Sequence, residues 1–162
     1  MNAQLVENSS QSAVGSRPVL VVPMSIRRQM SLAVESVYPE EAVGILYGRI
    51  SAAGDRRLVE RVEHAFNEAP ARIRHNHYEI SPDRMLLAQK TAEERGEEIL
   101  GFFHSHPDAA PRPSDLDLAR AWPGYSYLIV GVTGGQAEEI KAYMLDEKRF
   151  EMLQQPLELD DA

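Results

Sequence analysis

The chain has 162 residues, of which 43% are hydrophobic, and its formal net charge is −8 at pH 7. This length and composition fit one globular domain with its own core, and the acidic balance argues against nucleic acid as the main partner, because phosphate binding needs a basic face. The lack of cysteine excludes disulfides, thiol nucleophiles and cysteine-based metal sites, and no apolar run approaches the roughly 20 residues that cross a bilayer.

The N-terminal stretch, residues 1–16, is polar and shows no sustained periodicity, so we expect a mobile tail. It has neither the basic start nor the apolar middle of a secretory signal. We therefore expect a cytoplasmic protein that has no membrane contact. The sequence leaves the oligomeric state open.

Apolar periodicity and breaker residues predict the elements of the first half of the chain. The helix start at Ser81-Pro82-Asp83 and the helix stop at Gly96 are the strongest of these signals, since they combine an N-cap serine, a proline in the first turn and a C-terminal glycine. The expected elements are a strand at 17–22, a helix at 25–37 with Ser25 as N-cap, strands at 42–50 and 57–66, a short edge strand at 74–80, and a helix at 81–96.

The second half predicts further strands around a short helix. Ser114 and Asp117 form an S-x-x-D capping box, which marks the helix start. Because strands and helices intermix without regular alternation, we expect an α/β (α+β) fold with a mixed sheet flanked by helices. The expected elements are a strand at 98–104, a proline-rich loop at 107–113, a helix from 114 to about 122, a hairpin of 125–132 with 138–145 through Gly134-Gly135, and an acidic C-terminal tail at 151–162.

Two histidines one residue apart, His104 and His106, are the centre of the predicted site. On a strand both imidazoles face the same side and can bind one metal ion, and Pro107 places them at the carboxyl edge of the sheet, where sites form. An isolated H-x-H pair is more often structural, and so is an aspartate in a first helical turn, but Ser114 and Asp117 follow within a short stiff loop. Three protein ligands leave one tetrahedral position for water, which is typical of a catalytic zinc site and indicates a hydrolase.

A metal-dependent hydrolase also needs a carboxylate that takes a proton from water and passes it to the leaving amine. Glu40 and Glu41, just before the strand at 42–50, are the candidates. Glutamate at such a place normally faces solvent. We prefer Glu41, because its offset from Val43 and Gly44 places it at the edge of the strand.

These residues resemble the JAMM/MPN+ zinc metallopeptidase signature. The matching parts are Glu41 to Gly48 (EAVGILYG), H-S-H-P at 104–107, and S-x-x-D at 114–117, which follows His106 after seven intervening residues. The similarity covers about residues 18–145, and the full motif is specific, whereas its E-x-x-G half alone is weak. It implies a JAMM/MPN fold, a curved mixed sheet in a single domain over 17–150.

The resemblance also implies a role for each matching residue. It makes His104, His106 and Asp117 the ligands of one Zn²⁺ per chain, and Glu41 the general base and acid. Ser114 would donate a hydrogen bond to the tetrahedral oxyanion. In that family zinc polarises the scissile carbonyl while the glutamate activates water.

The segment between Asp117 and Tyr125 limits the class of substrate that we expect. In eukaryotic members, insertions near the site hold two linked ubiquitins, and this segment is too short to contain one. The chain is similar to the compact bacterial and archaeal members, including the CysO-cysteine peptidase group. Those members cleave after the C-terminal Gly-Gly of ubiquitin-like or sulfur-carrier proteins, and some release cysteine from a carrier–cysteine adduct. We expect a partner of that kind.

Other interpretations predict different features. A non-catalytic MPN scaffold or binding module would lack ligands, yet all four positions are present. A RadC-like, DNA-associated protein would carry an upstream helical portion and a less acidic charge. His75 and His77 form a second H-x-H pair, which fits an edge strand or a substrate-contacting flap better than a second metal site. Whether the N-terminal tail or the loop at 67–77 covers the site stays open.

Overall fold

The computed structural model of the chain describes residues 17–148 and 150–160, so the expected tail at 1–16 lies outside the described residues. Within these ranges no helix is both long and apolar enough to cross a membrane. The elements in chain order are β1 (Val19–Pro23), α1 (Met24–Ser36), β2 (Val43–Ile50), β3 (Arg56–Ala65), the 3₁₀ turn η1 (Ala71–Ile73), α2 (Pro82–Arg95), β4 (Glu98–Pro107), α3 (Asp115–Arg120), β5 (Ser126–Thr133), β6 (Gln136–Asp146), β7 (Glu151–Gln155) and β8 (Leu157–Asp160).

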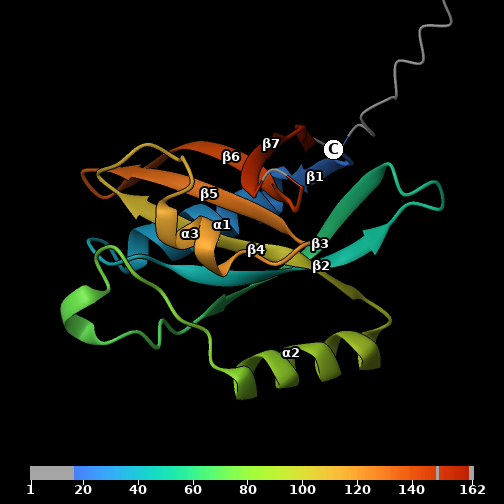
Figure 1. Cartoon of the computed structure of the whole chain (residues 1–162). Helices are drawn as coiled ribbons and strands as arrows, with labels where there is room; N and C mark the ends of the chain where they lie inside the picture. Colours follow the sequence, from blue (N-terminus) through green and yellow to red (C-terminus); the bar gives the residue numbers. More distant parts are fainter. Residues whose placement is uncertain (1–16, 149, 161–162) are drawn as a thin grey trace, which may run out of the picture.

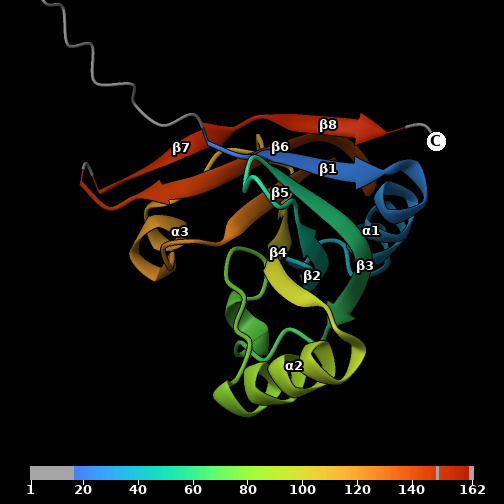
Figure 2. The same ribbon diagram turned by 90° about the vertical axis from the view of Figure 1, so that its right-hand side faces the viewer.

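All eight described strands belong to one mixed sheet in the order β7-β6-β5-β4-β2-β3-β1-β8 (Figure 1). The β4–β5, β1–β3 and β1–β8 pairs are parallel, and the other neighbours are antiparallel. The sheet curls so far that its two end strands, β7 and β8, follow one another across the top of Figure 2. The predicted fold class, a curved mixed sheet flanked by helices in one domain, is confirmed.

The C-terminal segment closes this curl, whereas the sequence suggested an acidic tail at 151–162. Within it, residues 151–160 form β7 and β8, which pair with β6 and β1 respectively. Leu157 and Leu159 pack against the core while the acidic residues between and after them alternate outward, which is the period of a half-buried strand. The Gln155 side chain adds a bond from Nε2 to the Pro18 carbonyl (2.9 Å).

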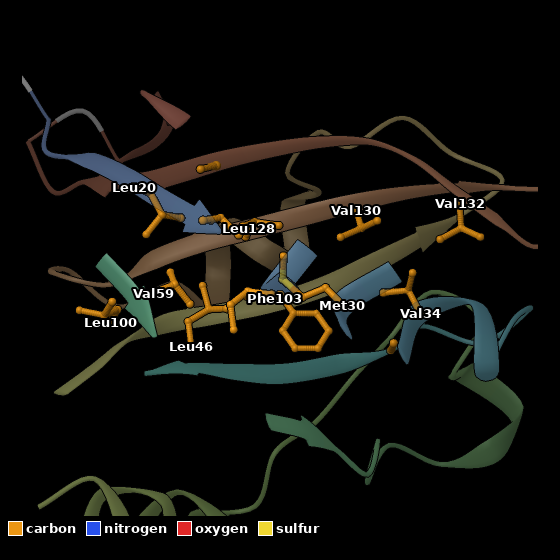
Figure 3. Close-up of a cluster of buried hydrophobic side chains, with 14 residues drawn as sticks. Leu20, Met30, Val34, Leu46, Val59, Leu100, Phe103, Leu128, Val130 and Val132 are labelled. Carbon is orange, nitrogen blue, oxygen red and sulfur yellow. The ribbon is translucent and has the colours of Figure 1, made fainter. Parts of the chain in front are cut away.

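The two faces of the sheet bury separate apolar clusters under different helices. Helix α1 packs Ile26, Met30 and Val34 against one face, and their spacing is that of one side of a helix. Figure 3 shows Met30 and Val34 beside Phe103 of β4. Helix α2 covers the other face with Ala88, where the second cluster lies. Figure 2 shows the two helices well apart.

Two expected features of the helices and their connections are corrected, and one is confirmed. Helix α1 begins at Met24 with Pro23 as N-cap and no side-chain cap, not at Ser25, because the chain turns from β1 directly into the helix. Ser81 does cap α2, and Gly96 ends it in the left-handed conformation. The segment 74–80 is not an edge strand. Both edges of β2 and of β3 are already paired, which leaves it no strand to join.

Gly48 lies where the backbones of β2 and β3 approach too closely for a side chain. A Cβ atom at this position would lie 1.8 Å from the Leu58 carbonyl oxygen. We expect Gly48→Ala to lower the free energy of unfolding by about 3 kcal/mol or more, since a main-chain clash cannot be relieved by a rotamer change. Gly54→Asn, in a left-handed turn with open space around it, should cost less than about 1 kcal/mol. Urea unfolding of both variants measures this difference, and equal costs would contradict the packing argument.

An ion pair ties the start of β4 to β3. Glu97 accepts from Arg61 at 2.7 Å, and the Arg61 guanidinium stacks 3.7 Å from the Tyr47 ring centroid. Hydrogen bonds from Arg61 hold the pKa of Glu97 below its usual value. A lowered pKa in the folded state stabilises the protein above pH 4.5, and this contribution is lost as the pH falls through the folded-state pKa.

Glu97→Gln should therefore lower the free energy of unfolding at pH 7 by about 1–3 kcal/mol. The difference from the parent should shrink as the pH falls from 4.5 through the folded-state pKa of Glu97, below which the parent carboxyl is neutral in both states. Denaturant unfolding between pH 3 and pH 7 checks the trend, and a difference independent of pH would contradict it.

Candidate metal centre

Strand β4 carries both predicted histidines on one face of the sheet. It runs through Pro107, past the predicted end at residue 104, so His104 and His106 both lie within a central strand between β2 and β5. Both histidines are buried, and their Nε2 atoms are 3.1 Å apart. Phe102 precedes them on the same side, which is the face that α2 covers. The strand thus brings the Nε2 atoms of both histidines close together on one face of the sheet.

Helix α3 brings Asp117 to the same point. The predicted capping box is present: Ser114 Oγ accepts from the Asp117 amide (3.1 Å), and the Ser114 amide donates to Asp117 Oδ2 (2.8 Å). The same carboxylate reaches both histidines, with Oδ1 3.2 Å from His104 Nε2 and Oδ2 3.3 Å from His106 Nε2. The helix ends at Arg120, two residues earlier than predicted.

These three residues fit a tetrahedral zinc ion. Each residue offers one ligand atom, and these atoms lie within 4.8 Å of one another. The Nε2 atoms of the two histidines are 3.1 Å apart, close to the roughly 3.3–3.4 Å between two ligands of a tetrahedral zinc ion. In the part of the chain that the structure describes, His104, His106 and Asp117 are the one group of three or more side chains gathered closely enough to hold a metal ion. The structure thus brings the predicted ligand residues together. His75 and His77 are not part of the group.

Burial and the neighbouring charges shift the pKa values of all three side chains. Burial lowers the pKa of His104. Burial also opposes charge on His106, but Asp117 and the Ala110 carbonyl outweigh it and raise the pKa of that imidazole. Burial would raise the pKa of Asp117, yet the two histidines hold it well below its usual range. The carboxylate is therefore ionised, as a metal ligand must be.

Hydrogen bonds around the group orient its nitrogen atoms. His106 Nδ1 lies 3.0 Å from the Ala110 carbonyl oxygen, so this nitrogen carries the proton and Nε2 faces the group. Such a partner behind a histidine is typical of metal sites, because it fixes the tautomer and the ring plane. The His104 ring lies against Tyr78, with 4.7 Å between the ring centroids. Its buried Nδ1 has no hydrogen-bond partner among the described residues.

The structure separates the two glutamates that the sequence left as candidates. Glu41 is buried beside the group, where burial raises its pKa to about 8 and the charges of His106 and Asp117 act on it. Glu40 turns aside, and its carboxylate lies 3.8 Å from Arg74 Nε. Glu41 is thus the carboxylate that shares the environment of the histidines.

Several residues of the site were not found by sequence reasoning. Asn67 and Tyr78 lie in the connection between β3 and α2, and neither belongs to a motif of the sequence. Arg120 donates to the Tyr78 carbonyl (2.7 Å) and lies 3.6 Å from the Glu79 carboxylate, so it ties the end of α3 to that connection. The one signal in the sequence for this region was the second H-x-H pair, His75 and His77, next to Tyr78.

Known proteins of three organisms are similar to this chain. A desampylase of Haloferax volcanii is 37% identical over 98 residues, which are 59% of this chain and 66% of the relative, just under two thirds of its length. A desampylase of Pyrococcus furiosus is 32% identical over 86% of this chain and 91% of its own. A probable TtuB-protein conjugate cleaving protease of Thermus thermophilus is 31% identical over 80% of this chain and 78% of its own.

The fold has a solved counterpart. The solution structure of a protein from Desulfitobacterium hafniense superposes with a TM-score of 0.75 at 28% identity, covering 89% of this chain and 94% of that protein. Residues 23–146, from the end of β1 to the end of β6, match the family described as prokaryotic homologs of the JAB domain. This segment holds every residue of the candidate metal centre, and the chain belongs to that prokaryotic branch of the JAB/MPN family.

Proposed function

We propose that this protein is a zinc metallopeptidase that hydrolyses the peptide or isopeptide bond after the C-terminal Gly-Gly of a small ubiquitin-like or sulfur-carrier protein. The observation that carries the proposal is the close grouping of His104, His106 and Asp117 beside the buried Glu41. Each chain would hold one zinc ion. A cytoplasmic location stays a prediction.

The three proposed ligands have the number and type of a catalytic zinc site. A bound zinc ion supplies Lewis acidity, which polarises a carbonyl and makes water more acidic. The Glu41 carboxylate accepts the proton of the attacking water and returns it to the leaving amine. Its burial strengthens it as a base, and it also keeps bulk water from competing for the proton.

In this proposal Ser114 stabilises the negative charge that develops on the carbonyl oxygen. Its Oγ already accepts a hydrogen bond from the Asp117 amide, which fixes the direction of the hydroxyl. The hydroxyl proton is therefore free to donate outward, and the side chain is exposed. A donor held in advance at the site of developing charge lowers the barrier without reorganisation.

The proposed substrate rests on the relatives and on the short connection after the site. The relatives are named for desampylase activity or for cleaving TtuB-protein conjugates. Only residues 121–125 lie between α3 and β5, which fits a single small partner better than two linked ones. Release of cysteine from a carrier–cysteine adduct is the narrower form of the proposal.

Zinc binding is tested at Asp117. Asp117→Asn keeps a side-chain acceptor for the helix cap but removes the ligand charge, so we expect zinc affinity to fall by more than about 100-fold. Asp115→Asn, in the same helical turn but outside the group, should bind zinc like the parent. Isothermal titration with zinc and metal analysis after dialysis measure both. Equal zinc content in the two variants would argue against the ligand set, and a parent that binds no zinc would favour a scaffold.

Hydrolysis is tested with TtuB of Thermus thermophilus joined through its C-terminal carboxyl to the ε-amino group of a lysine peptide. The zinc-loaded parent should release the peptide, and Glu41→Gln should slow release by about 10²–10⁴-fold while it retains zinc. Glu40→Gln is the matched control and should stay within a few-fold of the parent. Mass spectrometry follows both products, and equal rates for the two glutamine variants would remove Glu41 from the mechanism.

A second probe tests the narrower proposal, the release of cysteine. TtuB extended by one C-terminal cysteine should lose the mass of cysteine if the protein releases an amino acid from a carrier. If only the lysine-linked probe is cleaved, the activity is that of a conjugate-cleaving peptidase, and the cysteine form of the proposal is wrong.

A further inference from the structure

We propose that Asn67 is a positioning residue, whose buried side-chain amide holds the main chain of Glu41 and the segment that carries Tyr78 in their places beside the metal centre. The inference rests on the proposed function only in that it takes Glu41 as the base. Asn67 lies just beyond β3, touches none of the three proposed ligands, and belongs to no motif of the sequence.

The main chain at Glu41 is held from two sides. Its amide donates to the Arg74 carbonyl (2.7 Å), and its carbonyl accepts from Asn67 Nδ2 (3.0 Å). Ala42, the next residue, exchanges two bonds with Ser105, between the ligand histidines: its amide donates to Ser105 Oγ (2.8 Å), and its carbonyl accepts from the Ser105 amide (3.1 Å). Every main-chain polar group of the two residues thus has a partner.

Asn67 also organises the connection between β3 and α2. Its Nδ2 donates a second bond, to the His77 carbonyl (2.9 Å). Its Oδ1 accepts from the amides of Ala69 (3.0 Å) and Glu79 (3.2 Å). These four bonds use both donors and both acceptor positions of the amide side chain, and Asn67 is buried.

The two bonds of Asn67 to the main chain of His77 and Glu79 lie on either side of Tyr78. This tyrosine lies against the His104 ring, and its own carbonyl accepts from Arg120 of α3. One buried amide therefore joins three parts of the site: the backbone of the base, the aromatic wall behind His104 and, through Arg120, the helix that carries Asp117. A polar group buried this deeply is costly to leave unpaired, so its loss should release both anchors together.

Catalysis by a carboxylate depends on placing it to a fraction of an ångström. If Asn67 acts through Glu41, its loss should lower kcat and leave the zinc ligands and substrate affinity in place. It should also matter only while Glu41 can act as a base. These consequences differ from those of a general loss of stability.

The experiment compares Asn67→Ala with Asn76→Ala in the full-length zinc-loaded protein, using the lysine-linked TtuB probe. Asn76 is in the same segment but is exposed, and its side chain contacts the His77 ring without reaching Glu41. We expect Asn67→Ala to lower kcat at least tenfold with KM within about twofold and zinc content unchanged, and Asn76→Ala to match the parent. In a Glu41→Gln background the Asn67 substitution should add less than twofold, since the base is already absent.

A second measurement does not need activity. Amide hydrogen exchange followed by NMR should be at least tenfold faster at Glu41 and Glu79 in Asn67→Ala, with Phe103 in β4 unchanged as the internal reference. If this variant lacks a cooperative thermal transition, Asn67→Asp replaces it in both measurements, with exchange read at Glu41 alone, because it loses the two donor contacts and keeps the two acceptor contacts, including that to the Glu79 amide.

Unchanged exchange at Glu41 overturns the inference, whether or not the parent cleaves the probe. Full additivity with Glu41→Gln overturns it as well, because Asn67 would then act on something other than the base. A parent that does not cleave the probe counts against the proposed function alone.

Discussion

The pairing of the start of β2 with the end of β4 is the constraint on which the site depends. In the central part of the sheet Val43 lies opposite His104, so the residues just before Val43 must lie beside the histidines. Ser105 strengthens the pairing from the other face of β4, where its hydroxyl accepts the Ala42 amide. Neighbouring residues of β4 thus have different roles. His104 and His106 face α2 and belong to the candidate metal centre, whereas Ser105 between them holds the start of β2 in register.

The second constraint is the capping box of α3. A helix of six residues has little stability of its own, and it would not fix a side chain without help. Reciprocal bonds between Ser114 and Asp117 lock its first turn, and Arg120 ties its last turn to the 78–79 segment. The cap that begins the helix therefore also orients the carboxylate toward His104 and His106.

The sequence was sufficient for features that depend on local chemistry. The H-x-H spacing, the capping box, and the start and stop of α2 are each encoded within a few residues, and the structure confirms their geometry. Glu41 could be preferred over Glu40 only by its offset from the strand. The pairing of Glu40 with Arg74, which turns it away, involves residues far apart in the sequence.

The features that were missed depend on partners distant in the chain. β7 and β8 are short and acidic, and they become strands only because β6 and β1 offer open edges to them. The segment 74–80 alternates like a strand but finds no free edge. Asn67 is one polar residue in an irregular stretch, and its four bonds reach residues on both sides of it and back to Glu41.

The contacts that hold these residues bear on how a metal ion would bind. Structural zinc sites are folded by their ion, because nothing else holds the ligands together. Here the protein itself holds each proposed ligand, the histidines by a central strand and Asp117 by its cap. The proposed base, Glu41, is held by Asn67 and the Arg74 carbonyl. On the proposed function, zinc would enter a site whose side chains are already in place, which is the arrangement that a catalytic centre requires.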